Sequence, residues 1–355
     1  MNLGGDFYLF ANRVGLTFNV YEKNVDDLIY ETPLADATGF QKTFTNDAAL
    51  TNRGLEISLT FRPAKPGKDF NWNVYMNGSA IKQIVRRLPG EALVWFSDGR
   101  SVVSRVGGGQ NNYLHISQGV FGESGDVPVD PVTGLALRNG YSTSYFQAGD
   151  MYFKDVDGNY VIDDNDLQVG GSFEPIFTGG FGGTVMYKNF NLTISGAMLF
   201  DRTLRNNALS QRLQNYQDPL ALRDADGDGT PDIPATYVDI SDVDYYTLDR
   251  TNARYPNPFL VNTGTQSLRD AQTLFEEDGS YIKFNTAILG YNFNKDWLDR
   301  NFKLRNARLY FTIKNPFLIS RYSGPNPETV NSLGRDYLGN YPNTRAYTIG
   351  ANIEF

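Results

Sequence analysis

The last nine residues of the chain alternate between two kinds of side chain. Tyr347, Ile349, Ala351, Ile353 and Phe355 alternate with Thr348, Gly350, Asn352 and Glu354. Successive side chains of a β-strand point to opposite faces, so this segment predicts a strand with one apolar and one polar face. In lipid every backbone polar group must be paired internally, so only helices and closed barrels can cross a bilayer. The ending therefore favours an amphipathic sheet and, in a membrane, a closed barrel.

The same alternation recurs along the whole chain and predicts about nine strands, each of about 8–12 residues. Strands of about this length cross a bilayer when they are tilted. The expected strands are Leu3–Leu9, Val14–Val20, Leu55–Phe61, Phe70–Met76, Phe177–Tyr187, Phe190–Phe200, Tyr281–Phe293, Ala307–Ile313 and Tyr347–Phe355.

Short and long connections alternate between these strands. The connections at 11–13, 63–69 and 188–189 are short, and the one at 294–303 is moderate. The remaining connections are long and polar, and they cover 22–51, 77–176, 201–280 and 315–345. Outer-membrane barrels have short periplasmic turns and long extracellular loops, whereas a soluble sandwich has no reason to alternate in this way. We therefore expect an all-β, antiparallel transmembrane β-barrel, and the terminal aromatic residue is typical of the last strand of such a barrel.

An odd number of strands has a consequence for the size of that barrel. If the last strand runs down to the periplasm, the first strand also runs down and begins outside. A complete bacterial barrel has an even number of strands, so we expect this chain to be the C-terminal part of a larger barrel. The start, Met1–Asp6, has neither a basic segment nor an apolar run, which predicts a mature form or a fragment.

Composition is compatible with this fold and excludes several others. The 355 residues are 41% hydrophobic, mean hydropathy is -0.40, and the absence of any run of about 18 apolar residues excludes a transmembrane helix. Aromatic residues make up 14%, which fits both interfacial girdles and a carbohydrate-binding surface. The net charge of -8 argues against nucleic acid as a partner. The absence of cysteine excludes a disulfide framework and a thiolate metal site.

One acidic segment has the spacing of a calcium-binding loop. Oxygen-bearing side chains occupy positions 1, 3, 5, 9 and 12 of a twelve-residue loop, and Val161 can offer a carbonyl at position 7. These candidate ligands are Asp155, Asp157, Asn159, Asp163 and Asp166. Tyr160 replaces the usual glycine at position 6, and Asp166 replaces the usual glutamate at position 12. The alternative is a turn rich in Asp, Asn and Gly without a metal.

A second acidic segment begins with three aspartates at alternate positions. Such aspartates repel one another unless a cation neutralises them, and Gly229 stands at the turn position. The twelfth position is Ala235, which offers no carboxylate. A solvated acidic loop is therefore the alternative to a calcium site. The candidate ligands are Asp224, Asp226, Asp228 and Asp232.

Nothing in the sequence indicates catalysis, and we expect no catalytic residues and no enzyme. The pairs Asp163-Asp164 and Glu276-Glu277 are the kind that occur by chance in an acidic chain. The sole histidine, His115, has no triad-like neighbours and is interpreted as a structural residue. Aromatic and arginine residues in the long connections, such as Tyr246 and Tyr322, fit either ligand stacking or loop packing.

Several short segments, in a fixed order, resemble a known family. They are Val20–Lys23 followed by Asp26–Leu28, Thr51–Ile57, Gly149-Asp150 followed by 155–166, Phe177–Phe181, Tyr187–Phe190, Asp278–Lys283, Leu289–Tyr291, Tyr322–Glu328 and the aromatic end. Together they resemble the C-terminal portion of the SusC/RagA-like TonB-dependent outer-membrane transporters. The resemblance covers nearly all of the chain, and its specificity comes from the order of many short matches.

The resemblance implies a barrel typically of 22 strands in the bacterial outer membrane. It further implies an N-terminal plug, a segment that contacts TonB, a SusD-like surface lipoprotein that acts as a lid, and an oligosaccharide or a peptide as cargo. The plug, the TonB-contacting segment and the first barrel strands are missing from residues 1–355. We therefore expect nutrient import by capture under a lid, with calcium as a candidate loop ligand. The alternatives are a non-transporting structural or interaction barrel in a surface complex, and a soluble calcium-dependent sandwich that binds glycans.

Overall fold

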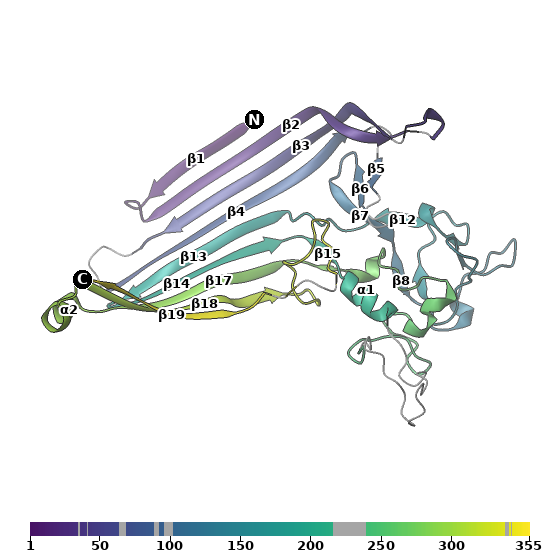
Figure 1. The fold of residues 1–355 in the computed structure, drawn as a ribbon. Coiled ribbons are helices and arrows are strands. Elements are labelled where there is room, and N and C mark those ends of the chain that lie inside the picture. Colours follow the sequence, from purple (N-terminus) through teal and green to yellow (C-terminus); the bar gives the residue numbers. More distant parts are fainter. Residues whose placement is uncertain are drawn as a thin grey trace, which may run out of the picture.

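One large antiparallel sheet dominates the computed structural model (Figure 1). Residues 1–34, 36–40, 42–63, 69–88, 92–95, 102–215, 239–337, 341 and 343–355 are described. The sheet has nine strands, and each strand pairs with the next expected strand in the chain, so β1 and β19 form its two edges. In order of pairing, they are β1 Asn2–Leu9, β2 Val14–Pro33, β3 Lys42–Phe61, β4 Phe70–Arg87, β13 Phe177–Tyr187, β14 Phe190–Phe200, β17 Tyr281–Asn292, β18 Asn306–Ser320 and β19 Ala346–Glu354. All nine predicted strands are confirmed.

The prediction of a long loop at 22–51 is wrong. Both β2 and β3 continue far beyond their alternating parts, and their pairing runs from Val14 opposite Phe61 to Pro33 opposite Lys42. The extension mixes polar and apolar residues without strict alternation, as in Val25–Ile29, and contains register shifts near Leu28, so its period-two signal is lost. The strand pair therefore projects beyond the apolar part of the sheet as a long hairpin (Figure 1).

The short connections gather at one end of the sheet, as expected (Figure 1). Phe10, Ala11 and Asn12 adopt left-handed backbone conformations in the first turn, and Lys188 does so in the two-residue hairpin. The moderate connection contains a helix, α2 Lys295–Phe302. The side chain of Asn294 caps this helix by accepting hydrogen bonds from the backbone N–H groups of Asp296 and Trp297.

The register of the sheet collects the apolar residues of all strands on one face. Across its middle, Leu59 of β3 is opposite Met76 of β4, which is opposite Phe181 of β13. On the other face, Ser58 of β3 is opposite Asn77 of β4. Leu59 is 38% exposed and Met76 is 48% exposed, so protein does not seal the apolar face. A soluble sandwich would bury these side chains, and the structure therefore disagrees with that alternative.

Aromatic side chains mark the two ends of the apolar face. Phe70, Tyr187, Phe190 and Tyr291 are successive partners across four strands at the short-turn end. At the other end Phe177 is opposite Phe200, with ring centroids 5.9 Å apart. The strand from Phe70 to Ala80 is about 33 Å long at about 3.3 Å per residue. At a tilt of about 40° its height is about 25 Å, which matches the apolar band of an outer-membrane barrel.

The long connections form a folded domain at the other end of the sheet (Figure 1). We call it the loop domain, and it comprises the described residues of 92–176, 201–280 and 321–345. Its strands are β5 Ala92–Trp95, β6 Val102–Arg105, β7 Gln110–His115, β8 Ser117–Val120, β9 Arg138–Asn139, β10 Met151–Phe153, β11 Val161–Ile162, β12 Leu167–Val169, β15 Thr203–Arg205 and β16 Glu276–Asp278. Its helices are α1 Asn207–Gln214 and the 3-10 turns Ser124–Asp126, Asp164–Asp166, Pro258–Thr263 and Thr273–Phe275. Outside the loop domain, one more 3-10 turn, Asp36–Thr38, connects β2 to β3.

The hydrophobic cores of the described residues lie in the loop domain. One cluster is built around Phe121, Met151 and Phe153, and a second around Leu213 and Phe275. No helix among the described residues is long and apolar enough to cross a membrane. The interior of the protein is therefore at the end of the sheet, whereas the face of the sheet is an outside surface.

Candidate functional site: the polar face and the loop domain

The polar face of the sheet is hollowed beside β2, β3 and β4. A depression of about 580 Å³ is lined by Asn19, Glu56, Ser58 and Asn77, and it extends to Thr178 at the start of β13. The side chains alternate with the apolar ones, so a hydrated wall and a lipid-compatible wall are built from the same strands. Such a surface offers hydrogen-bond donors and acceptors to a polar solute.

The loop domain pairs with the edge of β4 near the end of that strand. The backbone N–H of Val85 donates to the carbonyl of Gly108, and the N–H of Gly107 donates to the carbonyl of Val85. A second depression, of about 590 Å³, lies at this junction between β4 residues such as Ser79 and loop residues such as Glu174. The two depressions share Ser79 and Thr178. They form one polar path from the loop domain down the face of the sheet.

A buried carboxylate joins two of the long connections. Asp150 is fully buried, and its side chain accepts hydrogen bonds from the hydroxyls of Thr265 and Ser267, each at 2.7 Å, and from the N–H of Gln147 at 3.0 Å. Burial raises the pKa of Asp150 more than these hydrogen bonds lower it. More than a hundred residues separate Asp150 from Thr265, so this cluster fixes the loops relative to each other.

A second buried cluster brings in the connection before β19. Arg205 and Arg335 are both fully buried and lie on paired backbone segments. A guanidinium nitrogen of Arg205 lies 3.2 Å from a carboxylate oxygen of Asp270. The hydroxyl of Tyr322 donates to Asp336 at 2.7 Å, and burial followed by this hydrogen bond raises the pKa of Tyr322. These contacts therefore pack the three long connections against one another.

A third depression, of about 590 Å³, opens on the loop domain beside α1. Arg212, Asp242 and Asp244 supply charge, and the guanidinium of Arg254 lies over the ring of Tyr255 at 5.2 Å from its centroid. Paired charges beside an aromatic ring can bind polar ligands of several kinds. Tyr246 and Tyr322 are buried, which favours the packing interpretation for these two aromatics.

The structure brings together three of the five candidate ligands in the first acidic loop. Ligand oxygens of Asp155, Asp157 and Asp166 all lie within 4.8 Å of one another. The side chain of Asn159 instead bonds to Asp157 and accepts from the N–H of Val161, while Asp163 caps the turn Asp164–Asp166. Tyr160 has φ 60°, the left-handed conformation for which the usual glycine is suited.

The three carboxylates also accept backbone hydrogen bonds. Asp155 accepts from the N–H groups of Gly158 and Tyr160, and Asp166 accepts from those of Val156 and Asp163. The loop can therefore be held in shape without a metal, and calcium binding stays a prediction. The candidates Asp224, Asp226, Asp228 and Asp232 of the second loop lie outside the described residues.

We expect removal of calcium to loosen the acidic loops. Three close carboxylates repel one another, and a hard cation offsets this repulsion. Protease cleavage within 155–166 and 224–232 should therefore rise several-fold when a chelator is added. In the double variant Asp155→Asn, Asp157→Asn, the chelator should have no effect on the loop at 155–166. Equal cleavage of the unaltered protein with and without chelator would remove the calcium hypothesis.

The remaining titratable candidates have structural partners. Glu276 accepts from the side chain of Asn112 and the N–H of Gly171, and Glu277 accepts from the N–H and the hydroxyl of Ser323. His115 ends β7, is buried, and places Nε2 3.0 Å from the carbonyl oxygen of Asp163. These contacts connect separate loops, which is a packing role.

Acidification should destabilise the loop domain through His115. Burial, and then the charge of Arg269, lower the pKa of His115 to about 4. The unfolded chain binds this proton near pH 6.5, so stability is lost as the pH falls from about 6.5 to about 4, by up to about 3 kcal/mol. The raised pKa values of Asp150 and Asp166 act in the opposite direction. Pulse proteolysis measures the free energy of unfolding of the unaltered protein and of His115→Gln across this pH range. The difference between the two proteins should change by about this amount between about pH 6.5 and about pH 4. Identical pH profiles of the two proteins would contradict the prediction.

Curated proteins of one class are similar to the chain along its whole length. No family model matches the chain. The TonB-dependent receptor P3 of Formosa agariphila is 28% identical over 373 residues, covering 100% of this chain and 34% of the receptor. The TonB-dependent receptor SusC of Bacteroides thetaiotaomicron is 23% identical over 380 residues, covering 100% of this chain and 31% of SusC. The chain thus spans about a third of the length of the curated relatives it matches.

Solved structures agree on the fold. The structure of the RagAB peptide transporter superposes with a TM-score of 0.74 at 17% identity, covering 100% of this chain and 35% of that one. The RagAB peptide importer in the open-open state gives a TM-score of 0.71 at 18% identity, covering 100% and 34%. The chain is therefore similar over its whole length to TonB-dependent receptors, and its fold is that of about a third of the RagAB transporter chain. Its predicted resemblance to the SusC/RagA-like transporters is confirmed, as are the fold class and the outer-membrane location.

The sequence did not reveal the buried clusters of the loop domain. Gly149-Asp150 stood out only as part of the resemblance, and nothing marked Thr265 or Ser267 as its partners. These contacts cross more than a hundred residues and have no periodicity. A polar residue that is buried by distant loops carries no local sequence signal.

Proposed function

We propose that this chain is the C-terminal barrel part of a TonB-dependent importer that takes up an oligosaccharide or a peptide. The observation that carries the proposal is the two-sided sheet. It has an uncovered apolar face on one side, and on the other a polar path that continues to the folded loop domain. The depression with Tyr255 and Arg254 supplies a surface that suits either cargo. No covalent chemistry is required.

We propose further that residues 1–355 form the C-terminal segment of a barrel of 22 strands. The nine-stranded sheet has a free edge at β1 and another at β19 among the described residues. Free edges are costly in lipid, because each leaves a row of backbone groups unpaired. Preceding strands that pair with both edges would close the barrel. The plug and the TonB-contacting segment would lie in that preceding part, and a SusD-like lipoprotein would close over the loop domain.

The test combines uptake with assembly. Deleting the region that encodes this chain should abolish growth on the cargo, offered in parallel as oligosaccharides and as peptides from the natural habitat. A surface lipoprotein should co-purify with the tagged protein from detergent extracts. Intact uptake together with a lost surface assembly would support the interaction-barrel alternative. A chain that purifies as a monomer without detergent would exclude the transport proposal.

A further inference from the structure

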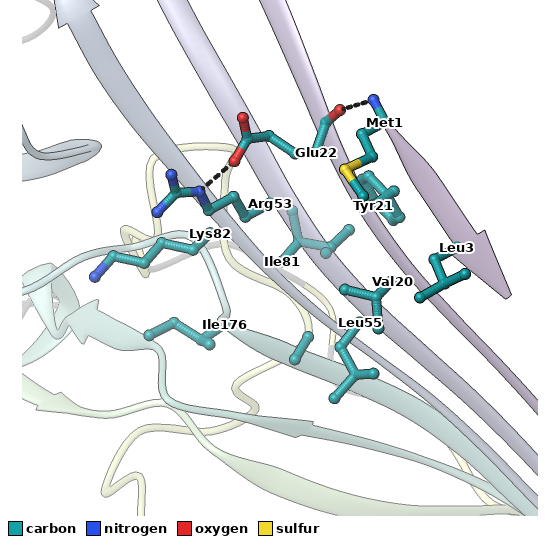
Figure 2. Close-up of a pocket in the computed structure, with 12 residues that line it drawn as sticks. Met1, Leu3, Val20, Tyr21, Glu22, Arg53, Leu55, Ile81, Lys82 and Ile176 are labelled. Atoms are coloured by element: carbon teal, nitrogen blue, oxygen red, sulfur yellow. Dashed lines mark hydrogen bonds and ion pairs between the residues drawn. The ribbon is translucent and has the colours of Figure 1, made fainter.

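A groove of about 510 Å³ lies on the apolar face at the end nearest the loop domain. Figure 2 shows the residues that line it, on β1 to β4 and at Ile176. The register places seven of these residues in two rows. Leu3, Val20, Leu55 and Ala80 are successive partners in an apolar row, and Glu22, Arg53 and Lys82 are successive partners in a charged row.

The charged row marks the edge of the apolar band. From the charged row toward the short turns, the side chains on the apolar face of β1 to β4 are apolar as far as the aromatic row. The charged row therefore lies at the level where lipid headgroups meet hydrocarbon. Long basic side chains are suited to this level, since their stems can lie on apolar surface while their charges stay in the polar layer. The small side chain of Ala80 leaves room in the row beneath. The groove is therefore apolar at its base and charged at its rim.

The rim carries an excess of positive charge. Arg53 Nε donates to Glu22 Oε2 at 2.8 Å (Figure 2), which leaves the other donors of its guanidinium group available. Of the basic residues of β4, Arg86 and Arg87 are ion-paired with Asp26 and Asp27. Lys82 is exposed and has no ion pair among the described residues. An anion at the rim would therefore meet Lys82 and the free side of Arg53.

We propose that this groove binds a phosphorylated lipid of the outer leaflet. One acyl chain would lie over Val20, Leu55 and Ala80, and a headgroup phosphate would contact Lys82 and Arg53. Two observations favour this occupant over a protein partner: the groove is apolar at membrane depth, and its cations stand at the headgroup level. Charge-assisted contacts of ammonium and guanidinium groups with phosphate are the strong polar contacts available there.

Native mass spectrometry of the full-length protein that carries this chain, purified from outer membranes in detergent, tests the proposal. The probe is diphosphoryl lipid A, and its fully dephosphorylated form is the comparison. We expect saturable binding of the phosphorylated form, with a Kd about tenfold weaker in Lys82→Gln. The double variant Glu22→Gln, Arg53→Gln, which removes both partners of the ion pair, should weaken binding similarly. Ala80→Trp should block the acyl chain without changing the charge.

Lys188→Gln is the matched control, because Lys188 lies in a hairpin at the opposite end of the sheet. It should leave the Kd unchanged. Heat-modifiable migration in gels verifies that each variant has folded before its Kd is measured. Equal affinity for phosphorylated and dephosphorylated lipid, or unchanged affinity in both Lys82→Gln and Ala80→Trp, would overturn the proposal. Inorganic phosphate that competes as well as the lipid would also overturn it, since the acyl chain would then contribute nothing.

Discussion

Leu59→Lys is expected to destabilise the folded barrel by about 2–4 kcal/mol, the cost of a lysine at the middle of the lipid-facing surface of a barrel. Leu59 lies in the central row of the apolar face, opposite Met76, and it is 38% exposed in the protein. In water, lysine at such an exposed strand position would cost little. A large loss of stability therefore reports that hydrocarbon covers this face.

Ser58→Lys is the matched control, one residue earlier on the same strand. Ser58 is exposed and lies on the polar face, where it is one of the residues that line the depression of about 580 Å³. Its replacement should change stability by well under 1 kcal/mol. Equilibrium unfolding in phospholipid vesicles, and the amount of folded protein in outer membranes, would measure both variants. If the two lysines had the same effect, the assignment of the two faces would be wrong.

Asp150→Ala is expected to loosen the loop domain by about 2–3 kcal/mol. The change removes a buried acceptor of hydrogen bonds from Thr265, Ser267 and Gln147 and leaves donors without a partner in a site that excludes water. The estimate is moderate because Thr265 and Ser267 can still contact each other, at 3.3 Å. Amide exchange in both hydrophobic cores should become faster by about 100-fold.

Asp130→Ala provides the comparison for this effect. Asp130 lies on the same domain and also accepts hydrogen bonds, from the N–H of Val132 and the hydroxyl of Thr133, but these bonds are exposed to solvent. Water can replace its contacts, so exchange in the cores should remain unchanged. Asp150→Ala should also lower ligand uptake if the loop domain holds the binding surface in place. Unchanged exchange in Asp150→Ala would show that the two long connections are fixed by other contacts.

Sequence periodicity predicted the large sheet because each strand carries its own signal. Segments such as Phe190–Phe200 alternate over most of their length, and each forms a strand where expected. The prediction failed at 22–51, where β2 and β3 extend as a hairpin with register shifts near Leu28. An extra residue in one strand moves the side chains that follow it to the other face, so a strand with register shifts has no regular period of two.

The candidate calcium loop and the buried clusters of the loop domain were also predicted only in part. Asp155, Asp157 and Asp166 lie close together, as the spacing of the acidic loop implied, because a short turn folds on itself. Asn159 and Asp163 turn to backbone partners instead, a choice set by local hydrogen bonds that spacing alone does not specify. The partners of Asp150 and Arg205 come from distant segments and had no sequence signal.

The amino-acid sequence by itself determined the nine strands, their two-sided character and the side on which lipid lies, since a period of two residues is a local property of the chain. Tertiary structure alone decided that the long connections pack into one domain with two hydrophobic cores and buried ionic clusters. The physical reason is that burial depends on which distant segments come into contact. The free energy of these contacts depends on residues from several segments, so no single segment predicts it.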